Sequence, residues 1–160
     1  LLAQESIAYA LKTGEPGDMM IGTSMTEANV SALMLWPHTN ICTDGSLLDR
    51  HPRGAGSFPK VLGRYVRDQG RLSLELAIHK MTGLPAEQLG LAQRGKVAEG
   101  YIADLVLFDP ATIIDRATTQ TPHRLSEGVS DVWVAGERVL QRGVSNDAFP
   151  GRVLRRAGAN

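Results

Sequence analysis

Asp44 is the residue of this sequence best placed to do chemistry. It ends the short run Ile41-Cys42-Thr43, which predicts a strand, and Gly45 follows it directly. A carboxylate at the carboxyl end of a barrel strand can transfer protons during metal-assisted hydrolysis. Thr-Asp-Gly also fits a simple turn, because Asp-Gly is a common turn pair.

The stretch after Asp44 favours the chemical interpretation. Two arginines, a histidine and an aspartate lie there between glycines and prolines: Asp49, Arg50, His51 and Arg53. The glycines and prolines predict a loop. So many ionisable side chains on one loop are unusual, and they indicate a site for polar chemistry rather than a plain connection.

With these residues the sequence resembles the N-acyl-D-amino-acid deacylases (D-aminoacylases) of the amidohydrolase superfamily. The motifs near Asp44 are Thr43-Asp44-Gly45, Asp49 to Arg53, Gly56 to Pro59 and Val61 to Val66. Similar segments follow in the same order: Met81 to Ala86, Arg94-Gly95, Glu99 to Pro110, Pro122-His123, Glu127-Gly128, Val134 to Gly136 and Pro150 to Arg156. The resemblance covers roughly residues 18 to 156, and several motifs in order are more specific than one.

The resemblance implies a zinc-dependent hydrolase that cleaves the amide bond of N-acyl-D-amino acids to a carboxylate and a free amino acid. Zinc would activate a water molecule, and Asp44 would take its proton and later protonate the leaving amino group. Asp44 could also touch the metal. The family's His-x-His pair is absent from this sequence, so the other ligands are expected upstream of Leu1. The 160 residues alone are therefore expected to be inactive.

Two further residues are candidates for substrate binding. Arg53 matches the family's arginine that holds the substrate carboxylate, and a guanidinium can bind a carboxylate through two hydrogen bonds. His51, like Asp49, could orient the loop by hydrogen bonds or act on the substrate. Ala55 stands where many family members have a larger residue near the substrate side chain, which could alter the acyl-amino acid that fits. Thr43 replaces the usual serine before the aspartate and keeps its hydroxyl.

The first part of the chain has helical spacing of apolar residues. It predicts helices near residues 3–14, from the capping pattern of Ser24 and Glu27 to Pro37, from Phe58 to Val66 with Pro59 in the first turn, and from the N-cap Ser73 to Met81. A strand at residues 18–23, the second helix and the strand before Asp44 would form one βαβ unit.

From Gly95 onward the pattern becomes strand-like. Ala103 to Phe108 predicts a buried strand, and Val129 to Ala135 predicts another. A turn at Gly136-Glu137 then leads into Arg138 to Gln141 as a hairpin. Residues 112–127 between them predict a long surface connection.

A complete (β/α)8 barrel needs on the order of 250 residues. Together with the resemblance, this length predicts an α/β fold made of the C-terminal strands and helices of a TIM-type barrel, followed by part of a small β-sandwich domain. Residues 1–94 would be the barrel part, with a substrate loop at 44–59, and residues 95–160 would be the small β-domain, with a structural role. An incomplete barrel exposes strand edges and apolar faces, so self-association is also expected.

Three residues that could be taken for site residues have plainer interpretations. Cys42 is expected to be a packed core thiol, because free cysteine is among the most buried residue types. His79 falls off the apolar stripe of its helix and is expected to face solvent. His123 is expected to pack or hydrogen-bond rather than to bind a ligand.

The composition excludes some classes of partner. With 42% hydrophobic residues, 21% charged residues and no net charge, nothing favours nucleic acid or an anionic membrane. The arginines from Arg152 to Arg156 are interpreted as a solvated or packed terminus. No run approaches the ~20 apolar residues of a membrane span. A single cysteine allows no intrachain disulfide, and a cytoplasmic protein is the default.

Two alternatives stay open. An amidohydrolase acting on a cyclic amide, such as a hydantoin or a dihydropyrimidine, would also carry Asp-Gly and the Ala-Asp-Leu-Val motif at 103–106. A non-catalytic binding module derived from the barrel would need no metal, whereas an enzyme needs three or more ligands converging on one point. His-Pro-Arg followed by Gly-Ser-Phe-Pro favours the deacylase.

Overall fold

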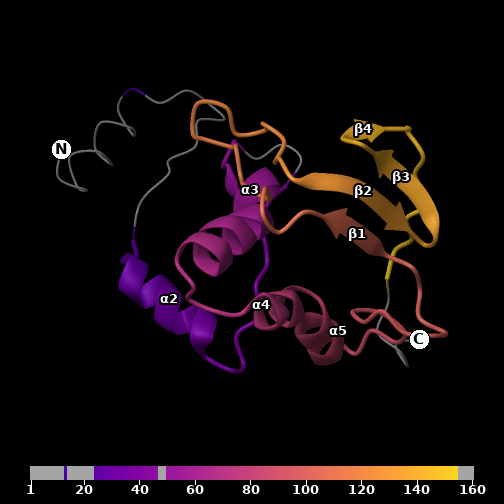
Figure 1. Cartoon of the computed structure of the whole chain (residues 1–160), viewed down its shortest axis with the longest axis horizontal. Helices are drawn as coiled ribbons and strands as arrows, with labels where there is room; N and C mark the ends of the chain where they lie inside the picture. The colour runs from indigo at the N-terminus through magenta and orange to yellow at the C-terminus, as the bar shows by residue number, and fades with distance from the viewer. Residues whose placement is uncertain (1–12, 14–23, 47–49, 155–160) are drawn as a thin grey trace.

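Helices and an antiparallel sheet form the two sides of the molecule (Figure 1). The computed structural model describes residues 13, 24–46 and 50–154. The helices are α2 (Glu27–Leu35), α3 (Arg53–Lys60), η1 (Val61–Asp68), α4 (Leu74–Met81) and α5 (Gly83–Leu89). The strands are β1 (Leu105–Phe108), β2 (Val129–Val134), β3 (Glu137–Gln141) and β4 (Val144–Ser145). The helix and strand predicted at 3–14 and 18–23 lie outside the described residues, except for Thr13.

Helix α2 is capped by Thr26, whose Oγ1 accepts a hydrogen bond from the backbone N–H of Asn29 at 3.2 Å. The prediction of Ser24 as the cap is wrong. The side chain of an N-cap residue accepts from the N–H two or three residues later, and here that residue is Thr26, three residues before Asn29. The helix ends at Leu35, ahead of Pro37, as predicted. Helix α4 also begins as predicted, since Ser73 Oγ accepts from the N–H of Leu76.

No strand forms in the segment that leads to Asp44. Residues 39–46 have no regular structure, and no described strand pairs with them. The backbone N–H of Ile41 instead donates to the carbonyl oxygen of Lys80 at 2.9 Å. A strand exists only through its ladder with a neighbour. The predicted strand before Asp44 is therefore wrong, and of the predicted βαβ unit the described residues show only the helix.

Lys80 fastens that segment to helix α4. Its side chain is fully buried, and its Nζ donates to the carbonyl oxygens of Trp36 at 2.6 Å and Thr39 at 2.9 Å. Buried backbone carbonyls need such partners, and the lysine supplies both. Burial also lowers the pKa of the Lys80 ammonium. A buried charged side chain thus fixes the path of the chain that ends at Asp44.

Helix α3 begins at Arg53 and runs directly into η1, a stretch of wider π-type turns in which the N–H of Gln69 donates to the carbonyl of Arg64. The predicted loop therefore ends at Pro52 rather than at Pro59. Pro59 lies inside the helix near its C-terminal end, not in its first turn, and it lacks the N–H that a regular turn would use. The wider turns follow directly after it.

The core lies against η1. Its buried apolar residues are Met34, Val61, Leu62, Tyr65, Leu72, Ala77 and Ile113. All of them precede the sheet in sequence except Ile113, which belongs to the connection between β1 and β2. Ile113 anchors the second part of the chain to the helices, together with the partly buried Phe108 and Val129, which pack against the same core.

The sheet is an antiparallel meander in the order β1-β2-β3-β4. The hairpin between β2 and β3 is confirmed, but its turn lies at Ala135-Gly136 rather than at Gly136-Glu137, because Glu137 already pairs with Val134. Ala135 and Gly136 have φ of 52° and 85°, as a tight hairpin turn requires. The prediction that β1 is buried is wrong, because Val106 and Leu107 are 56% and 54% exposed.

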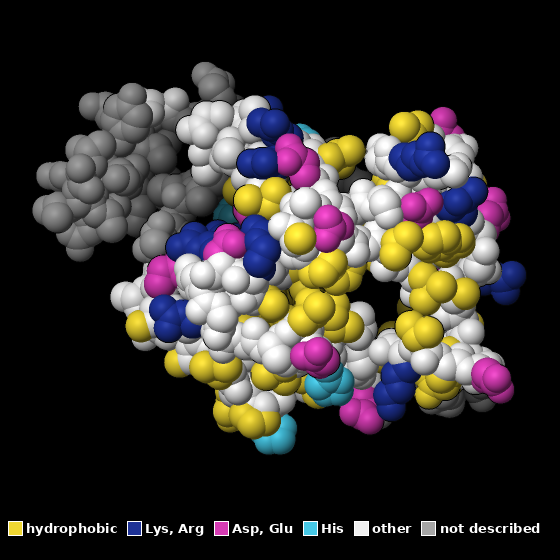
Figure 2. All heavy atoms as spheres, in the orientation of Figure 1, with side chains coloured by type: hydrophobic (Ala, Val, Ile, Leu, Met, Phe, Trp, Pro, Cys, Tyr) yellow, Lys and Arg dark blue, Asp and Glu magenta, His cyan; other side chains and the backbone are white. Residues whose placement is uncertain are grey.

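Figure 2 shows apolar side chains exposed on both parts of the molecule. None of the described helices is long and apolar enough to cross a membrane.

Candidate active site

Asp44 has a strained backbone. Its φ of 47° lies in the left-handed region, which non-glycine residues rarely adopt and which Asp and Asn tolerate best. The N–H of Gly45 donates to Thr43 Oγ1 at 3.3 Å and closes the turn on one side. Such strain persists where surrounding contacts hold it, and it is concentrated at functional sites. The turn leaves the Asp44 side chain 79% exposed.

Two glycines bring this turn against the first turn of helix α3. A Cβ on Gly45 would lie 2.3 Å from the Cα of Gly54, far inside van der Waals contact. Only glycine at position 45 permits this approach. The approach sets Asp44 beside the start of α3, where Arg53 is the first residue.

Asp44 and Arg53 form an ion pair, with Arg53 Nη1 3.0 Å from Asp44 Oδ2. The structure thus brings together two of the three predicted site residues. Both side chains are accessible, at 79% for Asp44 and 39% for Arg53. An accessible pair of this kind contributes only about 0–1 kcal/mol to stability, so either member can exchange its partner for a ligand at low cost.

His51 lies at the same helix start but has a different task. Its Nδ1 accepts a hydrogen bond from the backbone N–H of Arg53 at 3.1 Å. It therefore caps the first turn of α3 and holds the backbone of Arg53. Asp49, the other predicted loop residue, lies outside the described residues.

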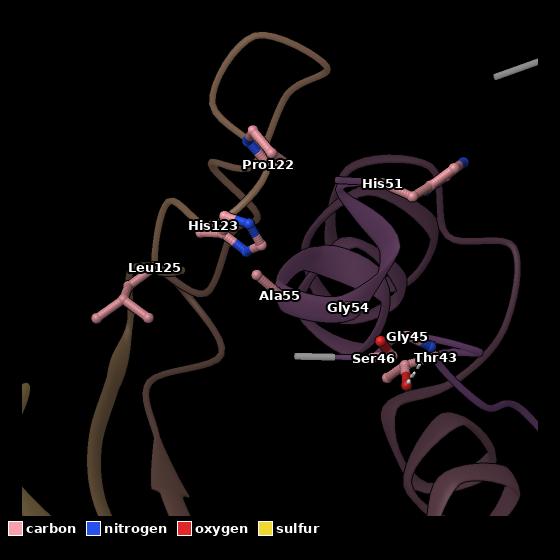
Figure 3. Close-up of a pocket in the computed structure, with 9 residues that line it drawn as sticks. All are labelled: Thr43, Gly45, Ser46, His51, Gly54, Ala55, Pro122, His123 and Leu125. Carbon is pink, nitrogen blue, oxygen red and sulfur yellow. Dashed lines mark hydrogen bonds between the residues drawn. The ribbon is translucent and has the colours of Figure 1, made fainter. Parts of the chain in front are cut away.

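A cavity of about 500 Å³ adjoins the pair (Figure 3). One wall is the turn after Asp44 and the start of α3, and the opposite wall belongs to the connection between β1 and β2. The lining residues are Thr43, Gly45, Ser46, His51, Gly54, Ala55, Pro122, His123 and Leu125. Ser126 Oγ donates to the carbonyl oxygen of Ala55 at 3.0 Å and joins the two walls. The sequence patterns gave no sign that residues 122–126 would reach this place.

The other candidates lie apart from the cavity lining. Cys42 is exposed, so the prediction of a buried core thiol is wrong, because no neighbouring strand in the described part of the chain covers it. His79 is exposed on α4, as predicted. The sequence pattern gives no sign of the buried Lys80, since a lysine within a helical pattern is normally solvent-facing. The described residues include no cluster of three or more His, Cys, Asp or Glu that could hold a metal ion.

Comparison with known proteins identifies the family. The profile of the Amidohydrolase family matches residues 34–140, which is more than half of the chain. The N-acyl-D-aspartate deacylase of Alcaligenes xylosoxydans xylosoxydans is 47% identical over 132 residues, 81% of this chain and 26% of the relative. The D-aminoacylase of the same organism is 45% identical over 137 residues, 84% of this chain and 28% of the relative. The chain thus spans little more than a quarter of either relative.

Solved structures agree with these relatives. A crystal structure of D-aminoacylase has a TM-score of 0.78 at 45% identity, over 82% of this chain and 28% of that one. The N-acyl-D-glutamate deacylase of Bordetella bronchiseptica, solved with zinc and a phosphonate inhibitor, has a TM-score of 0.75 at 42% identity over the same shares. The chain belongs to the amidohydrolase family, as its motifs predicted, and the N-acyl-D-amino-acid deacylases are its relatives within that family.

Proposed function

We propose that this chain is the C-terminal part of a zinc-dependent deacylase that hydrolyses the amide bond of N-acyl-D-amino acids. The observation that carries the proposal is the strained, accessible Asp44, paired with Arg53 at 3.0 Å beside a cavity of about 500 Å³. The relatives at 47% and 45% identity are named N-acyl-D-aspartate deacylase and D-aminoacylase, which supports an acylated amino acid over a cyclic amide as substrate.

Asp44 is the proton-transfer group in this proposal. Its carboxylate would take a proton from the attacking water and return it to the amino group that leaves. An open carboxylate oxygen is also a suitable donor for a zinc ion, and zinc when bound would acidify the water and polarise the amide carbonyl. The described residues do not complete a ligand set. The remaining ligands would come from the barrel strands that precede this region in such enzymes.

Arg53 would bind the substrate carboxylate. Without substrate it pairs with Asp44, and a substrate carboxylate offers the same two-oxygen acceptor. A substrate that takes over the guanidinium therefore leaves Asp44 unpaired and ready to accept a proton. His51 supports this exchange by holding the backbone of Arg53.

In the same proposal the described helices belong to a (β/α)8 barrel and residues 95–160 to its small β-domain. The barrel explains the helices that pack beside the segment leading to Asp44. It would also cover apolar side chains that are exposed here, such as Leu33 on α2 at 49% and Trp36 directly after it at 57%. Contact with a second copy of the chain would cover them as well. A cytoplasmic location remains a prediction from the composition.

The test measures zinc content and amino-acid release together. Two proteins are purified. One is the full chain alone. The other, called the joined protein, carries the N-terminal three quarters of the D-aminoacylase that the chain resembles, followed by the full chain. Each is analysed for bound zinc and assayed with N-acetyl-D-amino acids. Zinc and turnover in the joined protein, both lowered by Asp44→Ala, support the proposal. A folded joined protein that holds zinc but hydrolyses only cyclic amides, or nothing, contradicts it.

A further inference from the structure

The connection between β1 and β2, residues 109–128, forms a wall of the candidate site. The sequence predicts residues 112–127 of it as a long surface connection, with His123 packing or hydrogen-bonding. Pro122, His123 and Leu125 nevertheless line the cavity, opposite the turn that carries Asp44. In Figure 3 the imidazole of His123 is turned toward Ala55 at the start of α3.

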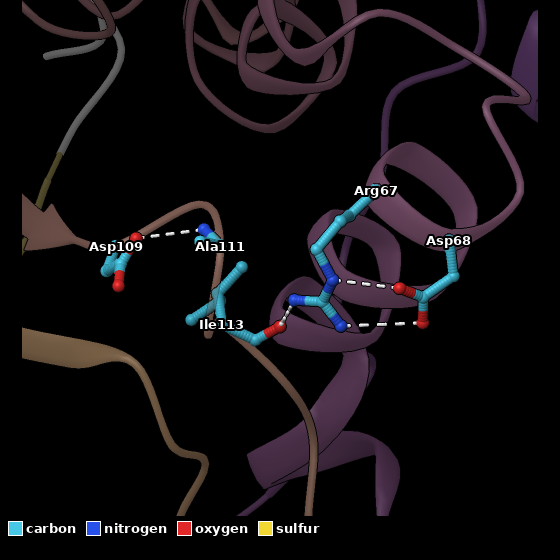
Figure 4. Close-up of polar contacts among 5 residues, drawn as sticks. All are labelled: Arg67, Asp68, Asp109, Ala111 and Ile113. Atoms are coloured by element: carbon cyan, nitrogen blue, oxygen red, sulfur yellow. Dashed lines mark hydrogen bonds and ion pairs between the residues drawn. The ribbon is translucent and has the colours of Figure 1, made fainter.

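The first half of this connection is firmly attached to the helices. Arg67 Nη1 donates to the carbonyl oxygen of Ile113 at 2.6 Å, and Asp68 holds the same guanidinium at 2.8 Å (Figure 4). Asp109 Oδ1 accepts from the N–H of Ala111 and shapes the turn that precedes Ile113. Ile113 is only 1% exposed.

The second half is attached as well. Ile114 and Glu127 exchange two backbone hydrogen bonds, at 3.1 and 3.0 Å, which close the segment between them into a loop. Ser126 then ties the end of this loop to the carbonyl of Ala55 at 3.0 Å. The loop that carries His123 is thus held at its base from both sides, so it can serve as a wall of fixed shape.

The hydrogen-bond donors in the cavity lining suit an anion. Among the lining residues that the structure describes, the ionisable side chains are the imidazoles of His51 and His123, and none is a carboxylate. Nδ1 of His51 is occupied by the backbone of Arg53. His123 is exposed, and Figure 3 shows it beside Ala55, across the cavity from the segment that carries His51.

We propose that His123 determines substrate specificity by donating a hydrogen bond to an acidic amino-acid side chain of the substrate. This inference rests on the proposed deacylase function. With the substrate α-carboxylate on Arg53, a side chain passing over Ala55 would meet His123. An aspartate or glutamate side chain ends in a carboxylate that an imidazole N–H can bind, whereas a leucine side chain gains nothing there.

The test compares substrates in the joined protein. kcat/KM is measured for N-acetyl-D-aspartate, N-acetyl-D-glutamate and N-acetyl-D-leucine, with His123→Leu and, as a matched control on remote helix α4, His79→Leu. We expect His123→Leu to lower the ratio of acidic to leucine substrate about 10- to 100-fold, the value of one hydrogen bond to a charged group. The control should leave the ratio unchanged. An unchanged ratio in His123→Leu overturns the inference while the deacylase function stands.

A binding measurement keeps the inference separate from turnover. The imidazole signals of the full chain are followed by NMR as N-acetyl-D-aspartate or N-acetyl-D-leucine is added. We expect the His123 signals to move with the aspartate compound at lower concentration than with the leucine compound. Equal responses, or a response at His79 instead, contradict the role of His123. Absence of hydrolysis with all three substrates, by contrast, counts against the proposed function itself.

Discussion

The helices and the sheet of this chain are held together in different ways. The helical part has a close-packed core around Leu62 and Tyr65, which are 7% and 5% exposed. No residue of strands β1 to β4 is buried to that degree, and β2 is half-buried along its whole length. The sheet depends on its backbone ladders instead. Residues placed on the helical side are thus fixed by packing, and the sheet side reaches the site only through its tethered connection.

The largest effect is expected at Asp44, on the helical side. Asp44→Asn in the joined protein should lower kcat by about 10²- to 10⁴-fold, the usual contribution of a proton-transfer group. Asp147→Asn is the matched control, because Asp147 also has a left-handed backbone, with φ of 59°, and follows the sheet. Steady-state kinetics of both variants would decide the matter. If Asp44→Asn and Asp147→Asn had equal kcat values, the catalytic role would not be specific to Asp44 on the helical side.

The difference in packing can be tested by side-chain truncation. Leu62→Ala should lower the free energy of unfolding by about 2–5 kcal/mol, because it opens a cavity in the core. Val106→Ala, on an exposed position of β1, should change it by less than about 0.5 kcal/mol. Urea denaturation of the full chain gives both values. A large loss for Val106→Ala would show that the sheet face is covered in solution.

The buried hydrogen bonds of Lys80 in the helical part can be tested in the same way. Lys80→Met leaves the carbonyls of Trp36 and Thr39 unpaired and should cost about 2–3 kcal/mol of unfolding free energy. Lys96→Met, at an exposed position, is the control and should cost little.

The pH dependence of Lys80 has a definite sign. Its pKa is lowered in the folded chain, so the unfolded chain binds more protons between the folded value and the ordinary value of 10.5. The stability contributed by this group should therefore rise with pH across that window. Lys80→Met should lack the rise, and denaturation curves at several alkaline pH values would show whether it does.

The smallest effect is expected in the connection. A hydrogen bond from Arg116 at 2.6 Å lowers the pKa of Glu127. Stability from this pair is present above the ordinary glutamate range and is lost as pH falls through the lowered value. Arg116→Gln should move the pKa of Glu127 back up, which NMR titration of the carboxyl group measures. An unmoved pKa would mean that the pair does not form in solution.

The regular elements could largely be predicted from the sequence, because local signals specify them. Ser73 caps α4 and Ala135-Gly136 turns the hairpin through contacts with near neighbours. The errors arose where distant residues decide. Ile41 finds its hydrogen bond on Lys80 rather than on a strand, and periodicity alone does not show that a lysine will be buried.

The candidate site also has one part that could be predicted from near neighbours in the sequence and one part that distant residues decide. Asp44 and Arg53 could be proposed as neighbours because they are close in sequence and share a family motif. His123 lies far along the chain, and contacts of its segment such as those of Ser126 with Ala55 and of Ile113 with the core bring it to the site. Contacts between residues so far apart have no signature in one sequence.

The approach of Gly45 and Gly54 makes the two positions unequal in what substitutions they can accept. A methyl group on Gly45 would collide with the backbone at 2.3 Å, whereas one on Gly54 would find its nearest neighbour at 3.6 Å. Alanine is therefore tolerated at position 54 without moving the turn that carries Asp44, but any residue other than glycine at position 45 pushes Asp44 and Arg53 apart. The distance between Asp44 and Arg53 thus depends on the missing side chain of Gly45, a residue to which the proposed function gives no chemical role.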